Sequence, residues 1–141
     1  MQNVKLKDLV EICYGKNQKQ IEVEYSDVPI LGTGGIIEYA SKPIYNEESV
    51  LIGRKGTISM PFYINKPFWT IDTLFYTKIN KKLVIPKYFH YLLCTIGLKR
   101  YAEGAAVSSL TTKTLNEIEL SIHNKEIQQH IVNIARYKYA Y

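Results

Sequence analysis

Residues 68–79 read FWTIDTLFYTKI, and every second side chain in this segment belongs to one mainly apolar set. That set contains Trp69, Ile71, Thr73, Phe75, Thr77 and Ile79, and the mixed set between them includes Thr70, Asp72, Tyr76 and Lys78. A period of two is typical of a β-strand, because successive side chains point to opposite faces of a sheet. The segment therefore predicts one strand that is buried on one face.

Two glycine-containing segments predict turns between short strand-like runs ahead of this strand, and the second of them predicts a β-hairpin. Residues 28–40 place GTGG between the runs VPIL and IIEYA, and residues 49–60 place GRKG between SVLI and TISM. A strand-like run follows GTGG, whereas a nucleotide-binding loop would open a helix, so GTGG predicts a backbone turn. The hairpin would carry Arg54 and Lys55 at its tip.

Helices are predicted at four places in the chain. Residues 4–12 fit a short helix that enters a strand, and Pro86 suits the first turn of a longer helix. Thr111 suits the cap of a short helix, and residues 123–141 carry isoleucines at helical spacing. Together with the strands, these signals predict an α/β (α+β) fold, as a single domain with a twisted, mostly antiparallel sheet and a few short helices.

The basic charge is concentrated in the middle of the chain. The 141 residues contain 18 Lys and Arg against 13 Asp and Glu, a formal net charge of +5. Residues 43–102 alone hold nine basic residues against three acids, and they also hold eleven of the 17 aromatic residues. Basic groups neutralise phosphates and aromatic rings stack on bases, so this combination favours nucleic-acid binding. The alternative is a solvated basic face over an aromatic core.

Other classes of protein find little support in the sequence. No apolar run approaches the roughly 18 residues of a membrane span and no signal-peptide core is present, which together predict a cytoplasmic protein without membrane contact. Cys13 and Cys94 are isolated, which argues against a zinc site or a disulfide scaffold. No histidine has an acid, cysteine or serine at a catalytic spacing. We therefore predict no catalytic residue, no metal site and no enzyme activity.

The residues best suited to contact DNA lie on three predicted loops. They are Lys16, Lys19, Arg54, Lys55, Ser108, Ser109, Thr111, Thr112 and Lys113. Arginine can donate two hydrogen bonds to guanine, whereas lysine and hydroxyl groups commonly hold phosphates. Each residue alone fits an ordinary solvated surface, and it is their grouping on loops that predicts a binding surface.

Longer motifs, taken in order, give the sequence a family resemblance. VPILGTGGIIEYASKPIY, SVLIGRKGTISMPFY, PFWTIDTLFY and AAVSSLTTKTLNEIELSI are followed by EIQQHI at the start of the last helix. This series resembles the target recognition domain of the DNA specificity (S) subunit of type I restriction-modification enzymes. The likeness extends from about Val4 to Ile134.

The resemblance implies a role and an assembly. It implies a DNA target recognition domain at residues 1–122, which reads one half of a bipartite double-stranded target, and the start of a spacer and dimerisation helix at 123–141. The implied partner face of that helix contains Ile127, Gln128, Ile131 and Ile134. Such a subunit performs no chemistry and needs no cofactor of its own. Its implied partners are DNA adenine methyltransferase subunits, which use S-adenosylmethionine, and a restriction and translocase subunit, which uses ATP and magnesium.

The chain departs from the family pattern at the last helix and in its length. His123 and Asn124 replace the usual prolines, which predicts a less rigid boundary before that helix. A full subunit has two recognition domains and two spacer helices, so we expect a half subunit that pairs with a second copy, a truncated product or an excised domain. A recognition-domain fragment of a fused restriction-methyltransferase polypeptide and a protein-interaction remnant that does not bind DNA are the alternatives.

Overall fold

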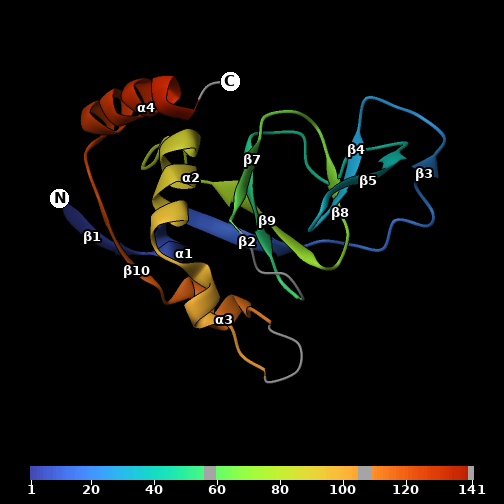
Figure 1. The fold of residues 1–141 in the computed structure, drawn as a ribbon, viewed down its shortest axis with the longest axis horizontal. Helices are drawn as coiled ribbons and strands as arrows, with labels where there is room; N and C mark the ends of the chain where they lie inside the picture. The colour runs from blue at the N-terminus through green and yellow to red at the C-terminus, as the bar shows by residue number, and fades with distance from the viewer. Residues whose placement is uncertain (56–59, 105–108, 140–141) are drawn as a thin grey trace.

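The computed structural model describes residues 1–55, 60–104 and 109–139, with side chains described as far as Arg136 (Figure 1). Strands and helices are mixed along the chain, which confirms the predicted α+β class. The strands are β1 (Gln2–Lys5), β2 (Val10–Tyr14), β3 (Glu22–Val23), β4 (Pro29–Gly32), β5 (Gly35–Ala40), β6 (Ser49–Gly53), β7 (Phe62–Ile64), β8 (Trp69–Thr70), β9 (Leu74–Ile79) and β10 (Glu119–Ile122). The helices are α1 (Leu6–Leu9), α2 (Pro86–Thr95), α3 (Thr112–Asn116) and α4 (Lys125–Tyr139), with a 3-10 helix η1 (Leu98–Tyr101).

The described strands form three sheets. β1 and β10 form a two-stranded ribbon, a central sheet has the order β2-β9-β6-β7, and an outer sheet has the order β3-β5-β4-β8. Among these strand pairs only β4 and β8 run parallel. Figure 1 shows the outer sheet extending to the right of the central sheet, with α2 and α4 on the left. The molecule therefore has a helical end and an end made of strands.

The main core lies between the central sheet and α2. Val50 and Ile52 of β6 and Phe75 of β9 are buried together with Phe89 and Leu93 of α2. Phe89 and Leu93 are four residues apart, so both side chains lie on the same face of the helix. The local signals for α2 are confirmed, because the helix starts at its proline and is followed by a glycine with a φ of +66°.

Residues 68–79 form two strands, so the predicted single strand is wrong. β8 ends at Thr70, a turn follows at residues 72–73, and β9 begins at Leu74 in the other four-stranded sheet. β9 lies between β2 and β6, and its residues 74–77 are all buried, so the expectation of one buried face is also wrong. The turn carries the chain from the outer sheet to the central sheet, which alternation of polarity does not encode.

Two buried hydroxyl groups join β6 to β9. The Thr77 hydroxyl donates to the Val50 carbonyl at 2.9 Å and accepts from the Val50 backbone N–H at 3.0 Å. The Ser49 hydroxyl donates to the Thr77 carbonyl at 2.7 Å and accepts from the Thr77 N–H at 2.9 Å. Ser49 and Thr77 are both fully buried. Side chains therefore continue the hydrogen bonding between these strands beyond their backbone pairing, which involves Ile52 and Gly53 of β6.

Replacing Thr77 with valine is expected to lower the free energy of unfolding by about 2 kcal/mol, because valine keeps the volume but leaves buried backbone groups of Val50 unpaired. Urea denaturation followed by circular dichroism measures the loss. Thr70→Val is the matched control, since the buried Thr70 hydroxyl has no hydrogen-bond partner within the described residues. Removing the Thr70 hydroxyl should leave the free energy of unfolding unchanged or raise it. Equal losses in the two variants would contradict the role assigned to Thr77.

Hydrogen bonds hold the boundary before α4. The Asn124 side-chain oxygen accepts from the backbone N–H of Ile127 at 3.0 Å, which caps the helix. The Tyr88 hydroxyl lies 3.0 Å from His123 Nδ1 and accepts from the His123 backbone N–H at 3.2 Å. The boundary is thus constrained at the two positions where the absence of proline had predicted a less rigid chain.

Gln128 ties α4 to the rest of the domain. Its side chain is fully buried, and the amide nitrogen donates to the carbonyls of His123 at 2.8 Å and Leu83 at 3.0 Å. The amide oxygen accepts from the backbone N–H of Ile85 at 2.8 Å. The sequence had placed Gln128 on the partner face of this helix, which is wrong. Its side chain points into the domain, where it pairs with two backbone groups just before α2 and with the His123 carbonyl just before α4.

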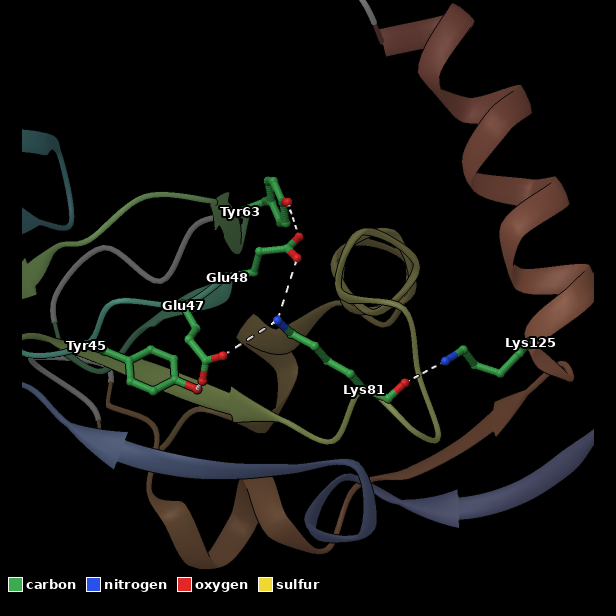
Figure 2. A network of polar contacts seen from close by, with 6 residues as sticks. All are labelled: Tyr45, Glu47, Glu48, Tyr63, Lys81 and Lys125. Carbon is green, nitrogen blue, oxygen red and sulfur yellow. Dashed lines mark hydrogen bonds and ion pairs between the residues drawn. The ribbon is translucent and has the colours of Figure 1, made fainter.

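A polar network on the surface adds to this attachment (Figure 2). Its members are Tyr45, Glu47, Glu48, Tyr63, Lys81 and Lys125. Lys81 Nζ lies 4.0 Å from a Glu47 carboxylate oxygen and 3.8 Å from one of Glu48, and the Lys81 carbonyl accepts from Lys125 Nζ at 2.5 Å. Ion pairs as exposed as these contribute little individually, at most about 1 kcal/mol each. Buried contacts such as those of Gln128 therefore dominate the attachment of α4.

Candidate nucleic-acid interface

Two segments that are distant in the sequence, residues 54–55 and the region around Ser109, meet at Arg54. The Arg54 carbonyl accepts from the Leu110 backbone N–H at 2.8 Å. Lys55 forms an antiparallel β-bridge with Ser109, and Ser109 forms a second such bridge with Glu103. The structure therefore brings together Arg54, Lys55 and Ser109, which the sequence had assigned to two separate loops.

Arg54 and Lys55 lie in the connection between β6 and β7, which pair antiparallel. The return strand β7 begins at Phe62, which is later than the predicted run at 57–60. Residues 56–59 lie outside the described residues. Lys55 also pairs with the segment at Ser109, and a contact at that sequence separation leaves no local signal.

The Arg54 side chain is held from two sides. Its Nη1 donates to the backbone carbonyl of Asp72 at 3.0 Å, and its guanidinium carbon lies 5.0 Å from the centre of the Tyr14 ring and 6.0 Å from that of Phe75. Its backbone N–H also donates to the Thr73 carbonyl at 2.8 Å. A guanidinium over an aromatic face is attracted by the ring quadrupole. The side chain therefore has a defined direction before any ligand arrives.

Tyr14 is a residue of this site that the sequence analysis missed. It is 50% exposed, pairs with Phe75 across β2 and β9, and its ring meets the Phe75 ring edge to face at 5.3 Å. The available signal was an aromatic residue directly before the basic loop that carries Lys16 and Lys19. The ring rests on the sheet and supports Arg54.

Lys16 lies at the junction of the central and outer sheets. Its backbone N–H donates to the Thr70 carbonyl at 2.9 Å, and its carbonyl accepts from the Trp69 indole N–H at 2.9 Å. This fixes the backbone of an exposed lysine next to the turn that carries Asp72. Lys19 is also exposed, and its backbone N–H donates to Asn17 at 2.9 Å. Lys16 thus lies beside the Arg54 site, and no described contact links Lys19 to it.

The loop at residues 109–113 contributes less than the sequence suggested. The Thr111 hydroxyl accepts from the Thr114 backbone N–H at 3.2 Å and caps α3, as predicted, so this hydroxyl already has a structural partner. Thr112 is partly buried, and Lys113 is exposed and lines a pocket of about 610 Å³ together with Glu117. Ser108 lies outside the described residues.

The predicted partner face of α4 is partly exposed. Ile127 and Ile134 are 43% and 60% exposed, whereas Ile131 is partly buried against the core. Ile131 and Ile134 also line an apolar groove of about 770 Å³ between α2, α4 and the segment before β7. The three isoleucines therefore remain candidates for a helix contact, without Gln128.

His90 and Cys94 line the same groove. Burial lowers the pKa of His90, partly opposed by its hydrogen bond to the Pro61 carbonyl, and burial raises the pKa of the Cys94 thiol. Burial therefore disfavours the charged form of both groups, and a thiol that keeps its proton is a weak nucleophile. Across residues 1–55, 60–104 and 109–139 there is no group of three or more His, Cys, Asp or Glu side chains arranged to hold a metal ion. No helix among them is long and apolar enough to span a membrane.

Comparison with known proteins relates both sequence and fold to one family. The family model described as "Type I restriction modification DNA specificity domain" matches residues 1–136. The comparison with curated proteins gave no match.

Three solved structures share the fold at low sequence identity. The S subunit of a type I restriction-modification system from M. genitalium aligns with a TM-score of 0.83 at 15% identity, over 96% of this chain and 38% of that one. A chain from a study of complex assembly and conformational transition of the type I R-M system aligns at 0.80 and 15% identity, over 97% and 37%. The HsdS subunit from Thermoanaerobacter tengcongensis aligns at 0.69 and 15% identity, over 96% and 36%.

The chain therefore spans less than two fifths of each of these three proteins. The shared fold extends over nearly all of this chain, and the family model covers all three sheets and most of α4. These matches agree with the motifs that run from the first predicted turn to the last helix. The chain belongs to the family of type I restriction-modification DNA specificity domains.

Proposed function

We propose that this chain binds double-stranded DNA with a preference for one sequence and so directs type I methylation and cleavage to one half of a bipartite target. The observation that supports this best is the Arg54 guanidinium, which is held at a partly exposed site between Asp72 and Tyr14. Exposed Lys55 follows Arg54 in the chain, and exposed Lys16 is hydrogen-bonded through its backbone to Thr70, close to the turn that carries Asp72. Both lysines suit phosphate contacts. The chain itself contributes recognition and no reaction in this proposal.

The proposed partners follow from the family rather than from the contacts of this chain. They are DNA adenine methyltransferase subunits with S-adenosylmethionine, a restriction and translocase subunit with ATP and magnesium, and a second copy of the chain. The exposed Ile127 and Ile134 on α4 support a contact with another helix. Within the proposal, residues 1–122 recognise DNA and the helix beyond them joins the assembly, either as a half subunit or as part of a longer polypeptide.

DNA selection tests the proposal directly. We expect the chain to enrich specific duplexes from a random pool, and its affinity to fall as salt rises, because phosphate contacts release counterions. Arg54→Ala should weaken binding to the selected duplex by about tenfold or more and binding to random duplex much less. Fluorescence anisotropy with labelled duplexes measures both affinities.

Lys82→Ala is the charge-matched control. Lys82 is exposed and follows β9 at the end away from Arg54, so its loss should weaken both duplexes slightly and equally. An equal loss on both duplexes in the Arg54 variant would reduce Arg54 to a phosphate contact. If no duplex binds at low salt, even with a modification subunit present, the chain is a protein-interaction remnant and the proposal is wrong.

A further inference from the structure

We propose that Arg54 reads a guanine in the major groove and that Tyr14 is the positioning residue that aims its guanidinium. This inference rests on the proposed function and adds the base that the site takes, a G·C pair. Three observations carry it. They are the contacts that hold the Arg54 guanidinium, the hydrogen-bond donors that these contacts leave over, and the packing of the Tyr14 ring on Phe75.

The available donors match the guanine edge. Arginine carries five N–H donors in one plane, and Nη1 already donates to the Asp72 carbonyl at 3.0 Å. Within the part of the chain that the structure describes, this is the hydrogen bond of the guanidinium, which leaves Nε and Nη2 on its side edge, where two parallel hydrogen bonds can be made. Guanine presents two adjacent acceptors, N7 and O6, in the major groove, and the other bases do not present that pair.

The contact with Tyr14 restrains the guanidinium without a hydrogen-bond acceptor. The guanidinium carbon lies 5.0 Å from the centre of the Tyr14 ring, where the ring quadrupole attracts the cation. Because Asp72 contributes a neutral backbone carbonyl, the side chain is directed without losing its charge to a carboxylate. Arg54 is therefore oriented but still fully cationic toward DNA.

The support under Arg54 is itself rigid. Tyr14 stands opposite Phe75 in the β2–β9 ladder, and Phe75 is fully buried in the core. The two rings meet edge to face at 5.3 Å with an interplanar angle of 65°. The orientation of Arg54 thus depends on the core of the domain rather than on a loop. A contact to a base edge needs this precision more than a contact to a phosphate does.

Lys16 and Lys55 differ from Arg54 in this respect. Both are exposed lysines whose described hydrogen bonds and bridges involve the backbone rather than the ammonium group. A lysine ammonium is a point charge on a flexible stem, which suits phosphate. The structure therefore assigns base reading to Arg54 and phosphate contacts to the two lysines.

The test uses duplexes selected by the unaltered chain. A guanine in the selected site is replaced by 7-deazaguanine, which removes the N7 acceptor and keeps Watson–Crick pairing. We expect one such position to weaken binding of the wild-type chain by roughly tenfold. The same replacement should leave Arg54→Ala unaffected, because that variant has no contact to lose.

Tyr14 is tested by two variants on the same duplexes. Tyr14→Leu should lose most of the discrimination between guanine and 7-deazaguanine. It should keep the salt dependence of binding and the affinity for random duplex. Tyr14→Phe, which keeps the ring, should behave as wild type. A merely structural role would lower binding to both duplexes in parallel.

Three results would overturn the inference. One is a selected site in which no guanine responds to N7 removal, and another is an equal response in the wild type and in Arg54→Ala. The third is full discrimination by Tyr14→Leu, which would remove Tyr14 from its role. Absence of any duplex binding would instead refute the proposed function, and the inference with it.

Discussion

Replacing Gly15 with alanine is expected to unfold the junction between the two four-stranded sheets. A Cβ atom built on Gly15 would lie 1.9 Å from the carbonyl oxygen of Ile71 and 2.7 Å from that of Thr70. Both atoms belong to backbone that is hydrogen-bonded to this loop, because the Gly15 and Lys16 N–H groups donate to Leu74 and Thr70. The strands would have to separate. The expected loss in the free energy of unfolding is at least about 3 kcal/mol.

Thermal denaturation and DNA binding together measure this effect. Tyr14 and Asp72 lie on opposite sides of the junction, so the variant should also lose the preference for its selected duplex. Gly34→Ala is the matched control, since a Cβ at Gly34 meets no atom within 4 Å. The control should keep the stability and binding of the wild type. A Gly15 variant as stable as that control would show that the junction tolerates a side chain and refute the prediction.

Replacing Gln128 with leucine is expected to cost about 2–4 kcal/mol and to loosen α4. Leucine fills most of the space, but it leaves the part-buried N–H of Ile85 and the carbonyls of Leu83 and His123 without the partner they have in the wild type. A buried polar group that loses its hydrogen bond costs about 1–3 kcal/mol, partly offset by the added apolar burial. Urea denaturation measures the loss, and hydrogen exchange should show faster exchange of the α4 amides.

Gln129→Leu separates this effect from a change in helix propensity. Gln129 is the exposed neighbour, and its amide donates only to Asn133 on the same helix at 3.0 Å among the described contacts. Its replacement should change stability by no more than about 0.5 kcal/mol. If both variants lose equally, the buried hydrogen bonds of Gln128 do not hold the helix.

Features with a local chemical cause could be predicted from the sequence. Pro86 opens α2 because its fixed φ suits a first helical turn, and Thr111 caps α3 with its own hydroxyl. Within GTGG, Thr33 and Gly34 form the two-residue turn between β4 and β5, and Gly35 at the start of β5 has a φ of +118° that other residues rarely adopt. The family resemblance extended the prediction to fold class and recognition role, and the matches to known proteins confirm the family.

Features that depend on distant partners could not be predicted in this way. The break in residues 68–79 exists because two different sheets meet there, and the pairing of Lys55 with Ser109 joins segments more than fifty residues apart. Gln128 looks like an exposed polar residue on a helix until the backbone groups that surround it are known. Tyr14 joined the site only through its place opposite Phe75.

Under the proposed function, the way Arg54 is held has a kinetic consequence. Exposed lysines such as Lys16 would attract DNA over distance, so we expect them to set how fast an encounter forms and how strongly salt slows it. The proposed contact of Arg54 with a base would form only once the groove is in register. Because Asp72 and Tyr14 already restrain the side chain, little further ordering would be needed then. We therefore expect the contribution of Arg54 to fall on the residence time, so that the domain leaves unrelated DNA quickly and dwells where its base is present.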